Sequence, residues 1–148
     1  MAMWYTIIAL VSVIPLSHGV PPCYDLGEHA MKQEVKDQIV QKVIFYSEQP
    51  ITSVSSVYDC DLEKMAGEIL EGPHKYLKFL EEIGIHALPF SISETPGATL
   101  YLMTHAALDT WKKHIPKVPF VTFGCNYKEN HGAHHYLCLL RYKVDFSS

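Results

Sequence analysis

The sequence lacks the short motifs on which several classes of function depend. It has no Cys-x-x-Cys pair, which argues against a redox motif and a zinc ribbon. It has no glycine-rich phosphate-binding loop and no stripe of basic residues, and the formal net charge is −4, so we expect no nucleic-acid partner. Neither of its two asparagines, Asn126 and Asn130, begins an Asn-x-Ser/Thr sequon, so N-glycosylation is not expected.

Long apolar runs are also scarce, because the only one occupies residues 1–16. This run carries no charged side chain, and residues 17–19 (Ser-His-Gly) place small residues where a signal peptidase reads. We therefore predict that residues 1–19 are a secretory signal peptide and that residues 20–148 form one secreted, extracellular domain. A membrane anchor is the alternative, but the run is shorter than the roughly 20 residues that span a bilayer. No membrane span is expected in the mature chain.

All four cysteines, Cys23, Cys60, Cys125 and Cys138, lie after the predicted signal. A secreted chain matures in an oxidising compartment, where cysteines are normally found as disulfides. An even number of them therefore favours two disulfides, for which three pairings are possible.

The last part of the chain predicts a β-hairpin that discriminates between these pairings. Apolar or aromatic residues occupy every second position over 121–127 and 136–142, and the polar segment 128–132 joins the two runs. If Cys125 lies opposite Cys138, antiparallel pairing brings together further apolar or aromatic residues only: Val121 with Tyr142, Phe123 with Leu140, and Tyr127 with Tyr136. A register shifted by one residue would place Cys125 against the opposite face. We therefore predict a Cys125–Cys138 disulfide, which leaves Cys23 to pair with Cys60.

The remaining segments alternate between helical and extended patterns. Apolar residues at three- and four-residue spacing predict helices over 25–46, from Asp59 or Asp61 to about residue 70, from Pro73 to Ile83, and over 98–115. Asp25 is expected to cap the first helix and Lys36 to lie on its polar side. Segments 51–58 and 85–92 are expected to be extended, with Pro89 favouring a sheet edge. The sequence thus predicts an α+β protein with helices packed around a small antiparallel sheet.

Several stretches of the chain occur in a recognisable order. Residues 23–66 combine a leading cysteine, an amphipathic helix and Val-Tyr-Asp-Cys-Asp-Leu-Glu-Lys-Met-Ala at 57–66; Ala-Ala-Leu-Asp-Thr-Trp follows at 106–111, and Phe-Gly-Cys-Asn-Tyr at 123–127 precedes His-Tyr-Leu-Cys at 135–138. This order resembles nematode secreted proteins of the CAP superfamily, which includes SCP-like, venom-allergen-like and activation-associated secreted proteins. The resemblance implies a reduced CAP-like sandwich with a C-terminal hairpin.

The family's usual cleft residues have no counterparts in this sequence. Residues 43–47 (Val-Ile-Phe-Tyr-Ser) stand where the family usually has His-Asn-x-x-Arg, and the Gly-His-Tyr-Thr-Gln and Trp-Tyr-x-Glu segments are absent. No cleft residue is therefore transferred to this chain. Because the cleft histidines and acids are missing and the chain is short, it more closely resembles the small secreted clade V nematode proteins, the SCVP type.

One group of side chains in the sequence is suited to metal binding. His131, His134 and His135, with Glu129 nearby, could collect a zinc or copper ion. However, His134 and His135 are neighbours on a predicted strand, so their side chains point to opposite faces and at most three ligands share one side. A solvated hairpin loop explains the group equally, and we predict no metal ion and no other cofactor.

Nucleophilic catalysis is not indicated by any residue pattern. The serines in segment 53–56 have no Gly-x-Ser-x-Gly setting, and no free thiol remains if all four cysteines pair. The sequence therefore predicts that the protein is not an enzyme.

Two functions of different classes remain open. The first is a monomeric, secreted, non-catalytic protein that binds a macromolecule of a host or of the extracellular medium. The second is a carrier that holds a small apolar ligand, such as a sterol or fatty acid, between its helices. A large unfilled apolar cavity would favour the carrier, and a filled core with exposed apolar side chains would favour the interaction protein.

The predicted signal peptide gives a direct test of processing. Cleavage after Gly19 should leave Val20 as the first residue of the secreted protein, because the apolar run and its small-residue cleavage site end there. Mass spectrometry of intact protein from culture medium should return the mass of residues 20–148. Secreted protein that retains residues 1–19 would contradict this assignment.

Overall fold

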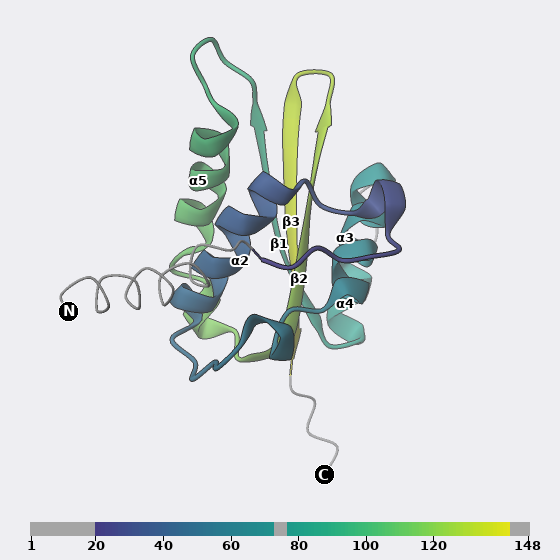
Figure 1. Cartoon of the computed structure of the whole chain (residues 1–148), viewed down its shortest axis with the longest axis vertical. Coiled ribbons are helices and arrows are strands. Elements are labelled where there is room, and N and C mark those ends of the chain that lie inside the picture. The colour runs from purple at the N-terminus through teal and green to yellow at the C-terminus, as the bar shows by residue number, and fades with distance from the viewer. Residues whose placement is uncertain (1–19, 73–76, 143–148) are drawn as a thin grey trace, which may run out of the picture.

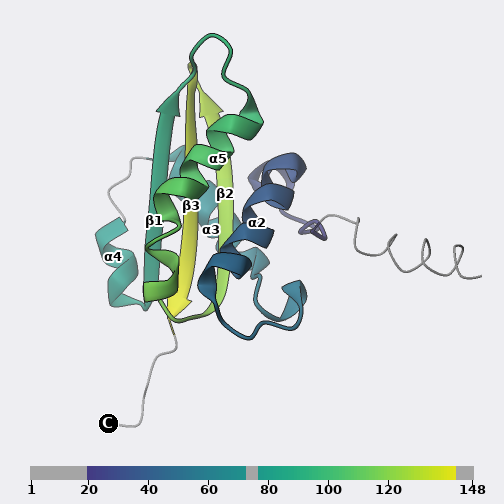
Figure 2. The same cartoon turned by 90° about the vertical axis from the view of Figure 1, so that its left-hand side faces the viewer.

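A computed structural model describes residues 20–72 and 77–142 of the chain. The predicted signal peptide and the first turn of the predicted third helix lie outside these residues. The described chain forms three layers, with a three-stranded sheet between two groups of helices (Figures 1 and 2). Its elements are η2 Gly27–His29, α2 Gln33–Ser47, η3 Val54–Ser56, α3 Cys60–Glu71, α4 Leu77–Glu82, β1 Ile85–Ser93, α5 Leu100–Trp111, η5 Ile115–Lys117, β2 Phe120–Asn130 and β3 Ala133–Tyr142.

The sheet is antiparallel and places β3 between β1 and β2. The predicted α+β class, with helices around a small antiparallel sheet, is therefore confirmed. Strand β1 lies at an edge, as Pro89 predicted, because proline has no N–H to donate to a second neighbour. None of the helices in the described ranges is long and apolar enough to cross a membrane.

The hairpin has the predicted register over most of its length. Cys125 lies opposite Cys138, and Phe123 opposite Leu140. The joining turn is shorter than predicted, since only His131 and Gly132 lie between the strands, both with positive φ as a tight hairpin requires. The pairing of Val121 with Tyr142 is wrong. An irregularity between Phe120 and Thr122 puts Phe120 opposite Tyr142 and leaves the Val121 side chain half exposed.

Both predicted disulfides are present. Cys23 is bonded to Cys60 and thereby joins the segment before α2 to the start of α3. Cys125 is bonded to Cys138 across the hairpin, with their Cα atoms 4.0 Å apart. No cysteine remains free.

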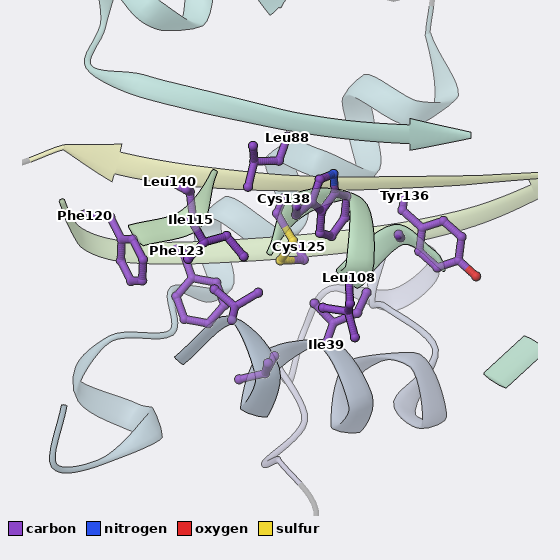
Figure 3. Close-up of a cluster of buried hydrophobic side chains, with 14 of the residues drawn as sticks. Ile39, Leu88, Leu108, Ile115, Phe120, Phe123, Cys125, Tyr136, Cys138 and Leu140 are labelled. Carbon is purple, nitrogen blue, oxygen red and sulfur yellow. A yellow bond between two sulfur atoms is a disulfide. The ribbon is translucent and has the colours of Figure 1, made fainter. Parts of the chain in front are cut away.

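Helices α2 and α5 cover one face of the sheet and enclose the larger part of the core. Side chains at every second position of β3, namely Tyr136, Cys138 and Leu140, point to this face, as strand alternation requires. They meet Ile39 of α2 and Leu108 of α5 (Figure 3). The fully buried Trp111 also lies in this cluster, so large side chains fill the space between the helices and the sheet.

Helices α3 and α4 cover the opposite face. Leu137 and Leu139, the alternate residues of β3, pack there against Leu62, Ile69 and other residues of the second cluster. The first turn of α3 lies directly on β2, because a Cβ atom built on Gly124 would be only 2.6 Å from the Asp59 carbonyl oxygen. Glycine is thus required at this position by close approach of two backbones.

Three sequence predictions in the first half of the chain are wrong. The first helix begins at Gln33, not at residue 25, because Asp25 has a positive φ of 70° that a helix cannot contain. Segment 51–58 is not extended throughout, since Val54–Ser56 form a 3₁₀ turn. Lys36 is not on the polar side of α2 but is buried.

The last predicted helix is also shorter than residues 98–115. It runs from Leu100 to Trp111, and Ile115 belongs to the separate turn η5. Thr99 caps it by accepting a hydrogen bond from the N–H of Leu102, which stabilises the first turn.

The close contact at Gly124 predicts a specific loss of stability. Gly124→Ala should lower the free energy of unfolding by about 1–3 kcal/mol or more, because the added methyl group forces α3 away from β2. Gly72→Ala is the control, since its nearest contact outside the chain neighbours is 3.8 Å away and it has no positive φ. Urea denaturation of both variants measures the difference. Equal stabilities would show that α3 does not lie as close to β2 as described.

Candidate functional site

The outer surface of helices α2 and α5 carries exposed aromatic and apolar side chains. We call Lys42, Phe45, Tyr101, Leu102 and His105 the α2–α5 face. The exposed fractions of Phe45, Tyr101 and Leu102 are 74%, 66% and 54%. These side chains project outward because Ile39 and Val43 of α2, and Ala107 and Leu108 of α5, occupy the opposite sides of the two helices.

The two helices that carry this face are held side by side (Figure 2). The Gln38 side chain donates a hydrogen bond of 3.2 Å to the carbonyl oxygen of Tyr101, near the start of both helices. Towards their ends, the Lys112 ammonium group lies 5.5 Å from the centre of the Tyr46 ring. These two contacts hold α2 and α5 against each other, and the α2–α5 face lies on the outside of this helix pair.

Local contacts also order the aromatic rings of this face. The Tyr101 and His105 rings are stacked with an interplanar angle of 2°, and the Lys42 ammonium group lies 5.8 Å from the centre of the Phe45 ring. Beyond Lys112, an open surface groove of about 660 Å³ is lined by Asp109, Thr110, Lys112, Lys113 and His114. The aromatic surface is thus bordered by charged groups, as protein-binding surfaces commonly are.

A buried ion pair joins α2 to α3 on the inside of the molecule. The Lys36 ammonium group lies 3.0 Å from a carboxylate oxygen of Glu63, and both side chains are 1% exposed. The other Glu63 oxygen accepts a hydrogen bond from the Met31 N–H at 3.1 Å. Lys36 also lies 3.2 Å from the sulfur of Cys23. The pair therefore fixes the segment before α2 against α3.

Tyr58 completes this buried group. Its hydroxyl donates to Glu63 at 2.5 Å, and its ring lies under the Lys36 ammonium group at 4.8 Å from the ring centre. Burial and then the Glu63 carboxylate raise the pKa of the Tyr58 phenol well above its usual value. The hydroxyl therefore stays protonated and remains a donor to Glu63. Every group here has a partner inside the protein, which is the arrangement of a structural network.

The histidines singled out in the sequence do not come together. His134 is buried on the α2–α5 side of the sheet, where its Nδ1 atom lies 2.5 Å from the Tyr127 hydroxyl. His135 points to the other face and is hydrogen-bonded to Ser91 at 2.7 Å. His131 occupies the hairpin turn. The predicted opposite orientation of His134 and His135 is confirmed, so a three-histidine site is not formed.

One surface groove has a mainly apolar lining that could suit an apolar ligand, but this groove is small. It has a volume of about 220 Å³ and is lined by Val20, Pro21, Pro22, Val54, Ser55, Tyr58 and Cys60. Pockets that enclose small organic ligands usually measure about 300–1,000 Å³. This groove is therefore a poor match for a sterol.

The comparisons with known proteins identify a family. The family model described as Ancylostoma-associated secreted protein related matches residues 23–140. The chain therefore belongs to this family, which is consistent with the expected relationship to nematode SCP-like secreted proteins. No curated protein and no solved structure was matched by the chain.

Sequence reasoning missed two groups of residues that the fold brings together. Lys36 and Glu63 were not recognised as partners, because they belong to different helices and only their burial reveals the pair. Glu94 was not singled out, although its carboxylate lies 3.8 Å from the Nε2 atom of His134. The end of β1 beside the hairpin supplies this contact, and no local sequence signal marks it.

The buried ion pair makes a prediction about stability. Glu63→Gln should lower the free energy of unfolding by about 3–5 kcal/mol, because it leaves the Lys36 charge buried without a counter-charge. Glu68→Gln, which removes an exposed charge from the same helix, should change it by less than about 0.5 kcal/mol. Thermal and urea denaturation measure both effects.

A double variant separates the charge effect from simple loss of contacts. Lys36→Met combined with Glu63→Gln removes both charges and should regain part of the stability lost in Glu63→Gln alone. The Lys36→Met single variant completes the comparison. If the double variant loses as much stability as the two single variants lose together, the ion pair does not couple the two helices.

Proposed function

We propose that this protein is a secreted, non-catalytic interaction protein that binds a host or other extracellular macromolecule through the α2–α5 face. The observation that carries the proposal is the exposure of Phe45, Tyr101 and Leu102 over a filled core. Aromatic side chains contribute a large share of the binding energy in many protein interfaces. Their placement on two helices held together offers such a surface already ordered, which lowers the entropic cost of binding.

Secretion is supported by three independent features. Both cysteine pairs are oxidised, as is usual outside the cytosol. The matched family is described as one of secreted proteins. In addition, the Val20 nitrogen lies 2.7 Å from a carboxylate oxygen of Asp37, so cleavage after Gly19 would place the new α-ammonium group against a carboxylate. The finer assignment to the SCVP type stays a prediction.

The absence of catalysis is supported by the chemistry of the candidate nucleophiles. All four cysteines are in disulfides, so none can act as a thiolate. The hydroxyl groups of Ser53 and Ser55 lie 3.5 Å from each other, and Ser56 donates to the Ser53 carbonyl oxygen. These are local turn contacts and not contacts with a general base.

The alternative function, a carrier of a sterol or fatty acid, has less support. Its best observation is the groove at Val20, Val54 and Tyr58, whose lining is mainly apolar. Lipid extraction of the purified secreted protein followed by mass spectrometry tests it directly. A stoichiometric sterol or fatty acid would favour the carrier over the interaction protein.

The proposed interaction is tested with a pair of matched surface variants. Phe45→Ser combined with Tyr101→Ser should weaken binding to the partner at least about tenfold, because aromatic hot spots each contribute about 2 kcal/mol or more. Phe79→Ser is the control, since Phe79 is an exposed aromatic residue on α4, on the other side of the sheet. Immobilised protein is incubated with host secretions and cell-surface extracts, and captured proteins are identified by mass spectrometry.

Only a partner whose capture depends on the α2–α5 face would support the proposal. Its dissociation constant is then measured for the wild type and both variants by calorimetry. A partner that binds the double variant and the wild type equally would place the interaction elsewhere. Circular dichroism of each variant should be unchanged, because exposed substitutions alter stability little.

A further inference from the structure

The tip of the hairpin and the end of β1 form a small polar site that the proposed function does not use. In the central strand β3, His134 pairs with Glu129 of β2 on one side and with Ile92 of β1 on the other. The Glu94 N–H, just beyond β1, donates a 2.7 Å hydrogen bond to the Gly132 carbonyl oxygen in the hairpin turn. This bond holds Glu94 beside the tip, so residues from three chain segments meet there.

His134 is the buried member of this site. It is 4% exposed, and its Nδ1 atom is hydrogen-bonded to the Tyr127 hydroxyl. Its Nε2 atom is buried and has no hydrogen-bond partner. A buried polar atom without a partner costs about 1–3 kcal/mol, so such an atom calls for an explanation.

Two carboxylates surround this unpartnered atom. The ligand atoms of Glu94, Glu129 and His134 all lie within 4.8 Å of one another, and Glu94 is 3.8 Å from Nε2. Glu94 and Glu129 are exposed, which leaves the site open to solvent on one side. Carboxylate oxygens and an imidazole nitrogen within 4.8 Å of one another are ligand types that a zinc ion accepts.

We propose that Glu94, Glu129 and His134 bind a Zn²⁺ ion, with His134 Nε2 and one oxygen of each carboxylate as ligands. Zinc accepts imidazole nitrogen and carboxylate oxygen together, whereas Mg²⁺ and Ca²⁺ prefer oxygen ligands only. Three protein ligands leave a fourth position for water on the open side. This proposal does not depend on the α2–α5 face.

Tyr127 positions the imidazole for this role. A zinc-binding histidine normally donates its other N–H to an acceptor, which fixes the tautomer that leaves the ligating nitrogen free. The Tyr127 oxygen can accept from Nδ1 in this way. Tyr127 is thus a positioning residue and not a ligand.

The proposed site differs from the histidine group considered in the sequence. His135 lies on the other face of the sheet, and His131 lies in the turn. Only His134 of the three contributes, and Glu94 of the β1–α5 connection takes part instead. Zinc binding should therefore depend on one specific histidine of the adjacent pair, which makes the two residues a matched test and control.

The test measures zinc affinity of the secreted protein by calorimetry. All proteins carry His29→Gln, because Glu28, His29 and Glu71 form a second group of metal-ligand type at the surface. His134→Gln and Glu94→Gln, tested separately, should each weaken Zn²⁺ binding at least about 10–100-fold. Losses of this size are found even when only a residue hydrogen-bonded to a zinc ligand is replaced. His135→Gln should bind Zn²⁺ as the parent does.

Two further readouts distinguish a metal site from a buried ion pair. Tyr127→Phe should weaken zinc binding about tenfold without removing a ligand. Nitrogen NMR of the zinc-bound parent should show His134 protonated at Nδ1 and metal-bound at Nε2. If His134→Gln fails to fold, Glu94→Gln still tests the site, because Glu94 is exposed and its substitution should not disturb the fold.

The proposal is overturned by any of three results. The first is that the parent shows no measurable Zn²⁺ binding at 1:1 stoichiometry. The second is that His134→Gln and His135→Gln lose the same affinity for zinc. The third is that His134 is protonated at both nitrogens in the presence of zinc. The last result would assign the carboxylates to a simple ion pair with an imidazolium group.

Discussion

The fold depends on a central strand that is apolar on both faces. Tyr136, Cys138 and Leu140 point to one side of β3, and Leu137 and Leu139 point to the other. A strand of this kind is stable only if both faces of the sheet are covered, because burial of apolar surface provides most of the stabilising free energy. The three-layer arrangement of two helix pairs around β3 satisfies this requirement, and it leaves the outer helix surfaces available for other roles (Figure 1).

The hairpin could be predicted from the sequence because its signals are local. A period of two, four cysteines and one glycine-containing turn fix the pairing of Cys125 with Cys138 without knowledge of the rest of the fold. The predicted strand pairing fails at Val121, where an irregularity in β2 shifts the register, and no residue type announces that irregularity in advance. The turn is also shorter than predicted. The helices were located for the same local reason, but α2 begins later and α5 ends earlier than predicted.

The buried polar groups could not be predicted, because they depend on contacts between segments distant in sequence. A lysine in an amphipathic helix is normally assigned to the solvent side, yet Lys36 is buried because Glu63 and Tyr58 lie opposite it. Similarly, Glu94 approaches His134 only because β1 pairs with β3 rather than with β2. The order of strands in a sheet therefore decides which side chains form a site, and periodicity does not contain that information.

The different spans of the two disulfides have a consequence for how the chain matures. Cys125 and Cys138 are 13 residues apart in one hairpin, whereas Cys23 and Cys60 are 37 apart and meet only when α2 and α3 are both in place. Closing a short loop costs less entropy than closing a long one, so oxidation should proceed from the hairpin outward. During that interval, the hairpin of the sheet would be covalently closed while the amino-terminal segment is still free.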